Sequence, residues 1–269
     1  MNFKSVKLIY FSPTGTTKKV LAAIAEGIHV DAVEQIDLTP PEARILPFAQ
    51  IQAELVVIGA PVYGGRIPID AKFGLQQIKA NNTPAVIVVM YGNREYEDAL
   101  LELNQIVVEA GFRPVAGGTF IGEHSFENES TPIAKGRPDI KDLQKATEFG
   151  RTIRKKLMRI QTPDEIHPLQ LPGNFPYREK MQPPNISPIT DATLCTMCEA
   201  CAKACPTAAI TVGDNILTAR NMCILCCACI KICPTGARVW QDSWVSTKAE
   251  WLNTNYYLRK EPEIYIGIK

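Results

Sequence analysis

The cysteines place the strongest constraint on what this 269-residue chain can fold into, because all nine lie between residues 195 and 233. A secreted protein held by disulfides more often spreads its cysteines through the fold, so we interpret this cluster as metal ligation in a reducing compartment. Eight of the nine fall into two runs of identical spacing, C-x2-C-x2-C-x3-C-P, at 195–206 and 223–234.

The two cysteine runs belong to an internal repeat. The segment DATLCTMCEACAKACPTAAI (191–210) is echoed by ARNMCILCCACIKICPTGAR (219–238). Each half is too small to bury a core of its own. The two halves are therefore predicted to pack together about a pseudo-twofold axis.

This part of the chain, about fifty residues long, resembles the two-cluster bacterial ferredoxins, whose signature is this cysteine run. The resemblance implies that three cysteines of each run and the fourth cysteine of the other run hold one 4Fe–4S cluster. The implied ligand sets are Cys195, Cys198, Cys201 and Cys233 for one cluster, and Cys223, Cys226, Cys229 and Cys205 for the other.

A pair of zinc sites is the alternative interpretation, since zinc also binds C-x2-C pairs. Zinc rarely needs a third cysteine two residues further on and a fourth three beyond, and here that spacing occurs twice. The ninth cysteine, Cys227, lies between two ligands. We interpret it as a small buried hydrophobe rather than a ligand.

The first 160 residues alternate between strand-like and helix-like stretches. Strands are expected at 6–11, 33–38, 55–60, 85–91 and 114–121, and helices at 17–28, 69–80, 96–110 and 138–160. Apolar runs of this kind, separated by helices, predict an α/β fold in which helices cover both faces of a parallel sheet. Five strands fit a doubly wound fold, whose ligands bind beyond the carboxyl ends of the strands.

Composition shifts divide the chain into four parts. The α/β domain spans 1–160, and a connector with seven prolines follows at 161–190. The cysteine domain spans 191–239, and a tail at 240–269 holds all three tryptophans. We interpret this tail as a packed cap rather than a binding surface. The basic stretch at 151–159 is interpreted as the solvated end of a helix, with docking of an acidic partner as the alternative.

Charge and hydropathy exclude several classes of function. The formal net charge is +1, so no global basic field indicates nucleic-acid binding. The longest apolar run, near 85–90, is too short to span a membrane. Residues 1–7 lack the apolar region of a signal peptide, so we expect a cytoplasmic protein. Whether the chain is a monomer or a homodimer is left open.

Residues 10–20, YFSPTGTTKKV, crowd four hydroxyls around one glycine where a strand is expected to end and a helix to begin. A Walker A loop and a dinucleotide fingerprint both require further glycines that are missing here. A helix cap without a ligand explains one or two hydroxyls, but not four. The pattern is typical of a turn that binds a terminal monophosphate at a helix N-terminus.

Residues 4–155 resemble the flavodoxins, whose FMN-phosphate loop has the pattern Ser/Thr-x-Thr-Gly-x-Thr. The matching residues are Ser12, Thr14, Gly15, Thr16 and Thr17. The loops at 59–68 and 91–99 stand where flavodoxins hold the isoalloxazine ring. The residues that the resemblance implies there are Pro61, Tyr63, Gly64, Gly65, Tyr91, Gly92, Asn93, Arg94 and Tyr96, with Tyr63 and Tyr96 as stacking candidates and Asn93 and Arg94 as candidates to bond the ring or ribitol. Lys18 and Lys19 depart from the family, which usually relies on neutral donors.

Together the two halves resemble flavodoxin–ferredoxin fusions, which implies an electron-transfer protein that relays electrons between two 4Fe–4S clusters and FMN. Its partners would be redox proteins, such as a low-potential ferredoxin or an oxidoreductase. One alternative is an FMN-dependent reductase of a small substrate, in which His124 of the segment GEHSF is the candidate proton donor. Another is a binding module whose flavodoxin fold holds no flavin.

Overall fold

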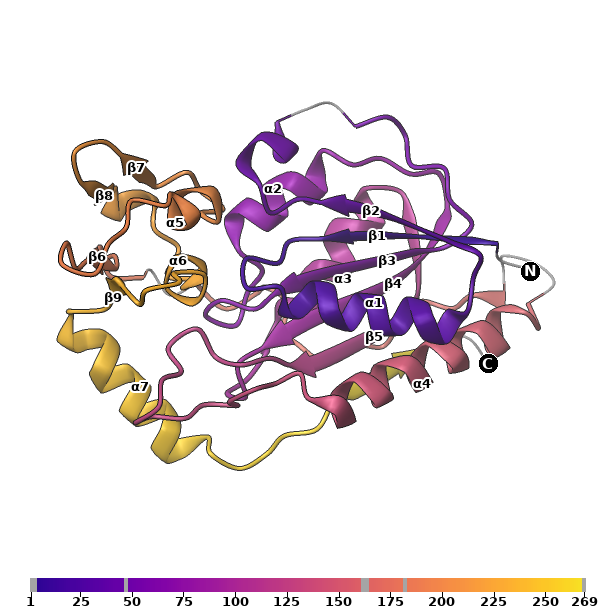
Figure 1. Cartoon of the computed structure of the whole chain (residues 1–269). Coiled ribbons are helices and arrows are strands. Elements are labelled where there is room, and N and C mark those ends of the chain that lie inside the picture. Colours follow the sequence, from indigo (N-terminus) through magenta and orange to yellow (C-terminus); the bar gives the residue numbers. More distant parts are fainter. Residues whose placement is uncertain (1–3, 46–47, 161–164, 181–182, 268–269) are drawn as a thin grey trace.

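A six-stranded sheet forms the centre of the larger domain in the computed structural model, which describes residues 4–45, 48–160, 165–180 and 183–267 (Figure 1). Its strands are β1 (Ser5–Tyr10), β2 (Ala32–Asp37), β3 (Val56–Pro61), β4 (Thr83–Tyr91), β5 (Phe112–Ile121) and β10 (Glu263–Ile266). The strand order is β10-β5-β4-β3-β1-β2, and β1 to β5 are parallel. The order 2-1-3-4-5 is that of the flavodoxin-like doubly wound fold, which confirms the predicted fold class.

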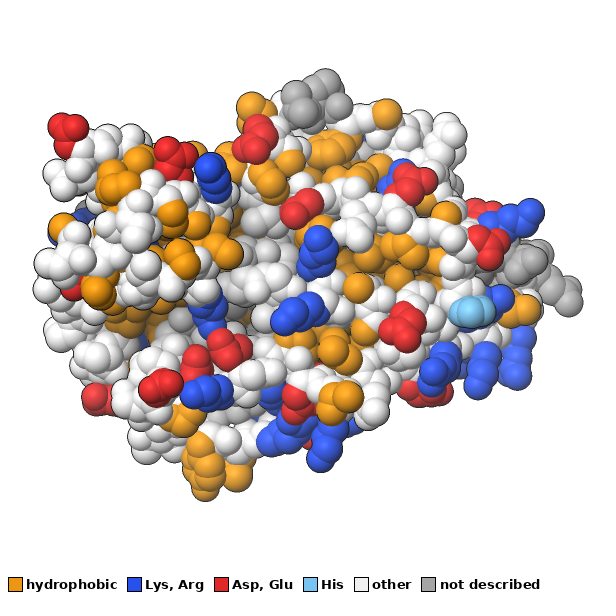
Figure 2. All heavy atoms as spheres, viewed as in Figure 1, with side chains coloured by type: hydrophobic (Ala, Val, Ile, Leu, Met, Phe, Trp, Pro, Cys, Tyr) orange, Lys and Arg blue, Asp and Glu red, His pale blue; other side chains and the backbone are white. Residues whose placement is uncertain are grey.

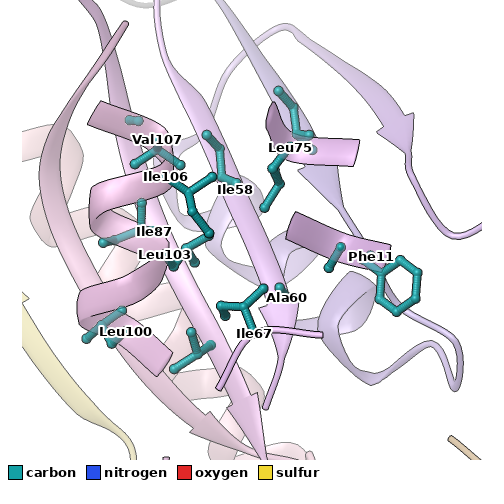
Figure 3. Close-up of a cluster of buried hydrophobic side chains, with 14 of the residues drawn as sticks. Phe11, Ile58, Ala60, Ile67, Leu75, Ile87, Leu100, Leu103, Ile106 and Val107 are labelled. Atoms are coloured by element: carbon teal, nitrogen blue, oxygen red, sulfur yellow. The ribbon is translucent and has the colours of Figure 1, made fainter. Parts of the chain in front are cut away.

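Two helical layers cover the sheet, as the continuous apolar strands predicted. Helices α1 (Thr16–Ile28) and α4 (Ile140–Leu157) share one buried cluster with the first face. Helices α2 (Ile69–Gln76) and α3 (Ala99–Glu109) share a second cluster on the other face, part of which Figure 3 shows around Ile58 and Ile87. Every residue of β3 is buried, because the strand lies between both layers.

The predicted five-stranded sheet was incomplete, since β10 from the C-terminal tail adds a sixth strand antiparallel to β5. Its register pairs Ile264 with Gly118 and Tyr265 with Gly117. The added strand covers the edge that β5 would otherwise expose. The tail also contains α7 (Ser243–Asn255), which leaves the small domain and runs beside the larger one (Figure 1).

The small domain contains the short α-helices α5 (Ala200–Lys203) and α6 (Ala228–Lys231) and the 3-10 helix η3 (Arg220–Met222). It also contains two pairs of short strands, β6 (Ile189–Thr190) with β9 (Arg238–Val239) and β7 (Ile210–Val212) with β8 (Ile216–Thr218). The two repeats share unusual backbone angles at corresponding positions. Met197 and Leu225 both have φ 57°, and Glu199 and Cys227 have φ 63° and 61°. The repeats therefore fold in the same way around their cysteines.

The connector lies along the larger domain. The Asp98 carboxylate accepts the N–H groups of Asn174 and Arg178, both at 2.8 Å. Arg66 donates to the Arg178 carbonyl at 2.8 Å and lies over the Tyr177 ring. Residues 161–164 and 181–182 of the predicted connector lie outside the described part of the chain.

Basic side chains gather at the C-terminal end of α4, at the lower right of Figure 2. Arg154 in the last turn of this helix donates to the Ile28 carbonyl at 2.8 Å. The basic stretch is thus placed at a helix terminus that favours positive charge. Among the described helices, none combines the length and the hydropathy that crossing a membrane requires.

Arg44 fastens the small domain to the larger one. It ends the short helix η1 (Pro41–Arg44), and its side chain is almost fully buried. The guanidinium donates to the carbonyls of Leu38, Thr39 and Pro206 at 2.8, 2.7 and 2.6 Å. Pro206 directly follows Cys205, so this contact fixes one end of the first cysteine run against the sheet.

Replacing Arg44 with glutamine is expected to loosen this junction. The shorter neutral side chain leaves at least one buried carbonyl unpaired, which costs about 1–3 kcal/mol. Anaerobic urea denaturation should show the loss, and limited proteolysis should cut the connector faster. Arg151→Gln is the matched control, because the side chain of this exposed arginine pairs with Glu148 on the surface. Equal stability and equal cleavage of the two variants would contradict the role given to Arg44.

Candidate functional site

A cavity of about 650 Å³ opens at the carboxyl ends of the parallel strands, where the doubly wound fold binds its ligands. Its size is that of an ordinary cofactor site. The larger domain supplies the walls that follow β1, β3, β4 and β5, and the small domain and α7 supply the opposite wall. The cavity is therefore a space between the two domains.

The hydroxyl-rich turn lines one end of this cavity through Ser12, Thr14, Thr16 and Thr17. Gly15 does not line the wall, but its φ of 79° makes the left-handed turn from which α1 starts. Gly15 has no side chain to cap that helix, and the Ser12 hydroxyl accepts the N–H of Lys18 at 3.1 Å. The N–H groups of Thr16 and Thr17 have no acceptor among the described residues, so they stay available for an anion. The Thr17 hydroxyl is buried and has no hydrogen-bond partner in the described residues. An unpaired buried hydroxyl beside a helix N-terminus fits a phosphate.

Two loops predicted from the sequence form the middle of the cavity. Tyr63 and Arg66 bridge a two-residue turn in which Gly64 and Gly65 have φ 62° and 80°, values that glycine adopts readily. Tyr63 and both glycines line the cavity, as does Pro61. Burial raises the pKa of Tyr63 well above its usual value, and the nearby thiols of Cys226 and Cys227 add to this effect. Tyr63 thus stands close to the second cysteine run.

The loop after β4 also reaches the cavity, through Tyr91, Gly92 and Arg94. Gly92 has no room for a side chain, because an added Cβ would stand 2.3 Å from Cδ2 of His124. Arg94 forms an ion pair with Glu97 at 2.6 Å, which fixes its side chain at the rim. Lys18 and Lys19 are exposed, in keeping with solvated side chains.

The structure places the side chains of Asn93 and Tyr96 against the C-terminal tail, and neither is among the described residues that line the cavity. The Asn93 amide is buried and donates to the carbonyls of Tyr256 and Leu258 at 2.5 and 2.8 Å. The Tyr96 ring is also buried, and its hydroxyl donates to Glu263 at 2.7 Å. Both side chains anchor the C-terminal tail, which the loop sequence alone does not reveal.

The wall opposite these loops was not predicted from the sequence. Trp244, Lys248 and Trp251 of α7 line the cavity, together with residues 221–225 of the small domain. The tail was interpreted as a packed cap, but it also forms part of the wall of the cavity. The available signal was the placement of every tryptophan in the last thirty residues. Lys248 lies 3.8 Å above the Trp251 ring, a cation–π contact that orders this wall.

His124 lines the cavity as an uncharged side chain. Its Nδ1 accepts the N–H of Phe126 at 3.0 Å, so the proton of the neutral ring is on Nε2. Burial, with help from nearby Lys231, Arg94 and Lys248, lowers the pKa of His124 to about 4. At neutral pH the ring can donate one hydrogen bond, but it holds no extra proton to transfer.

A second, smaller cavity lies within the small domain. Its walls include Cys195, Cys198, Cys201 and Cys233, so the fourth cysteine of one repeat meets the first three of the other. Cys205 in turn lies close enough to Cys223, Cys226 and Cys229 to interact with them electrostatically. The eight cysteines thus gather in the two crossed groups that the ferredoxin resemblance implied.

Left-handed residues stand at alternate positions in each cysteine run, at 197 and 199 in the first and at 225 and 227 in the second. Turns that contain left-handed residues can present backbone N–H groups to an anion. In the described residues, no three His, Cys, Asp or Glu side chains stand as a single metal ion requires. The spacing of the two cysteine runs is what favours iron–sulfur clusters over zinc.

Cys227 stands apart from both groups. It is 2 % exposed, and its Sγ accepts the indole N–H of Trp240 at 3.3 Å. Burial raises the pKa of this thiol to about 12. The corresponding residue of the first repeat is Glu199. Cys227 is therefore not one of the cysteines that the two repeats share.

Comparisons with known proteins support this picture of the small domain. Residues 187–234 match the family of 4Fe-4S dicluster domains. No curated protein sequence matches the chain.

Among solved structures, a flavodoxin from the domain Archaea is 17% identical, with 58% of this chain and 99% of that chain covered and a TM-score of 0.38. An apo NADH:FMN oxidoreductase (EMOB) is 17% identical over 61% of this chain and 93% of that chain, with a TM-score of 0.42. The rubredoxin oxygen:oxidoreductase of Desulfovibrio gigas is 18% identical over 58% of this chain and 36% of its own, also with a TM-score of 0.42.

The fold of the larger domain is assigned from its own strand order, β2-β1-β3-β4-β5, and not from these distant similarities. The small domain is assigned from its family match and its two cysteine runs. The chain therefore joins an α/β domain that has the flavodoxin-like strand order to a small domain that matches the 4Fe-4S dicluster family over residues 187–234.

Proposed function

We propose that this protein relays electrons between two 4Fe–4S clusters and FMN, and so converts between one-electron and two-electron steps. One observation carries the proposal: a single cavity brings the hydroxyl-rich turn of the larger domain together with residues 221–225, where the second cysteine run begins. A flavin site and a cluster site therefore share a wall. When bound, FMN supplies storage for two electrons, and each cluster carries one electron at a time.

The turn at residues 12–17 holds the terminal phosphate in this proposal. Thr14, Thr16 and Thr17 offer hydroxyl donors, and the positive end of the α1 dipole adds its field. The tyrosine and tryptophan rings, Tyr63 and Trp244 among them, provide apolar surface for the flavin ring. They also exclude water from the wall shared with the small domain.

The crossed cysteine groups hold the clusters. The group of Cys223, Cys226, Cys229 and Cys205 lies beside the flavin cavity, because Cys223 lines that cavity directly. The group with Cys198 is the more distant one, and Cys198 is exposed. We place the docking site of a redox partner protein there, either a low-potential ferredoxin or an oxidoreductase, and we place the protein in the cytoplasm.

The side chains of the cavity favour this relay over an FMN-dependent reductase. Such a reductase needs room for a substrate and a proton donor beside the ring. His124 is neutral at physiological pH, because burial disfavours its charged form. The small domain and α7 also form the wall opposite the carboxyl ends of the strands.

Replacing Thr17 with valine tests the phosphate assignment. The Thr17 hydroxyl has no partner in the described part of the chain, so the fold loses little when a methyl group takes its place. A hydrogen bond to a charged group contributes about 1.5–3 kcal/mol, so the affinity for FMN should fall about tenfold or more. Fluorescence titration of the flavin-free protein with FMN gives the dissociation constant.

Thr119→Val is the matched control. The Thr119 hydroxyl is likewise buried and unpartnered, but it lies in β5 and does not line the cavity. This variant should bind FMN as the wild type does. If both variants bind FMN equally well, the phosphate does not lie at Thr17.

Cysteine variants test the crossed ligation. Cys205→Ser should damage the cluster that Cys223, Cys226 and Cys229 hold, and should leave the other cluster in place. Cys227→Ser should leave both clusters intact, since this thiol bonds Trp240 instead. Iron analysis and electron paramagnetic resonance of the reduced proteins distinguish the outcomes. Loss of a cluster in the Cys227 variant would mean that the ligands are wrongly assigned.

Stopped-flow mixing with a reduced low-potential ferredoxin tests the relay itself. The absorbance bands of both the clusters and the flavin should bleach in the wild type. The variant Cys198→Ser/Cys226→Ser removes one cysteine from each group and none that lines the flavin cavity. In this variant flavin reduction should slow about tenfold or more, or about 1.4 kcal/mol in the barrier. Equally fast flavin reduction would show that electrons do not pass through the clusters.

A further inference from the structure

Arg238 is a buried arginine whose acceptors among the described residues are all neutral groups or sulfur. Its side chain is 2 % exposed. The guanidinium donates to the hydroxyls of Thr190 and Thr218 at 2.8 and 2.9 Å and to the Pro188 carbonyl at 3.1 Å. It also lies 3.8 Å from Sγ of Cys229. Its Nε has no hydrogen-bond partner among the described residues.

An ionised group in such a position requires an opposite charge nearby. Burial of an unpaired guanidinium is far more costly than burial of a neutral polar group, and buried charges are normally paired. The threonine hydroxyls and the proline carbonyl offer dipoles, but no net negative charge. The missing counter-charge must therefore come from what the cysteines hold.

Arg238 lies between the two cysteine groups. It lines the small cavity together with Cys195, Cys198, Cys201 and Cys233. It also contacts Cys229 of the other group, and its charge reaches Cys223. A 4Fe–4S cluster with four thiolate ligands is negatively charged, so both clusters can share this one cation.

Comparison of the two repeats indicates that the cysteine loop does not need an arginine at this position to fold. The sequence CPTGAR ends in Arg238, and the corresponding CPTAAI of the first repeat ends in Ile210. Ile210 is buried in the apolar core of the small domain. The same backbone position therefore accepts an apolar side chain in the first repeat. In the second repeat it holds a buried charge, and burial of a charge is unfavourable.

We propose that Arg238 is the buried counter-cation of both clusters and raises their reduction potentials above those set by the cysteine ligands alone. The inference rests on the proposed function, which places a cluster at each cysteine group. A cluster becomes more negative by one charge when it takes up one electron, and no proton is required. A nearby positive charge stabilises that reduced form, which raises the potential.

Redox titration of the intact protein, followed by electron paramagnetic resonance, tests the proposal. In Arg238→Gln the reduction potentials of both clusters should fall. The equilibrium should shift away from the reduced form about tenfold or more, which corresponds to about 59 mV for one electron. Arg238→Lys keeps the charge, so its potentials should stay close to those of the wild type. Arg220→Gln is the control, because it removes an equal charge from an exposed position three residues before Cys223. Its potentials should not move.

The outcomes separate this proposal from the proposed function. Absence of 4Fe–4S signals from the wild type would refute the clusters themselves. Full iron content with unshifted potentials in Arg238→Gln would refute the role of Arg238 alone, as would an equal fall in the lysine variant. If the glutamine variant loses its clusters while the lysine variant keeps them, the need for a buried cation is supported. Loss in both, with the fold retained by circular dichroism, contradicts it.

Discussion

The docking of the small domain on the carboxyl edge of the sheet is the constraint on which the rest of the structure depends. Three kinds of contact hold it there. Arg44 donates to the Pro206 carbonyl, Lys231 pairs with Glu123, and Ile224 packs against the apolar core of the larger domain. These contacts lie beside the cysteine runs. The forces that hold the domains together therefore also fix the position of the cysteines relative to the flavin cavity.

Local sequence predicted the parts of the site that local structure builds. The hydroxyl turn at residues 12–17 lines the cavity, at a strand–helix junction where Gly15 takes the left-handed conformation. The cysteine groups are crossed as the resemblance implied, since both repeats carry the same spacing and the same left-handed positions. A motif that lies within one turn or one repeat can thus be predicted from the sequence alone.

The parts that depend on tertiary contacts were not predictable in this way. Asn93 and Tyr96 lie in the loop that flavodoxins use to hold the flavin ring. In this chain, however, their side chains form hydrogen bonds to the C-terminal tail. The same tail supplies β10 to the sheet and the tryptophans of α7 to the cavity. Nothing in the loop sequences shows that a segment more than 140 residues further on packs against them. Contacts of this kind depend on the whole fold.

Flash photolysis of the intact protein tests most directly whether flavin and clusters meet within one chain. Light reduces the flavin of the anaerobic oxidised protein in the presence of a sacrificial donor, and the bleaching of the clusters is then followed in time. Contact across the interdomain cavity predicts a first-order rate constant that stays the same when the protein is diluted. A rate that falls in proportion to the protein concentration would show that electrons pass only between molecules, which would contradict the shared cavity as the route.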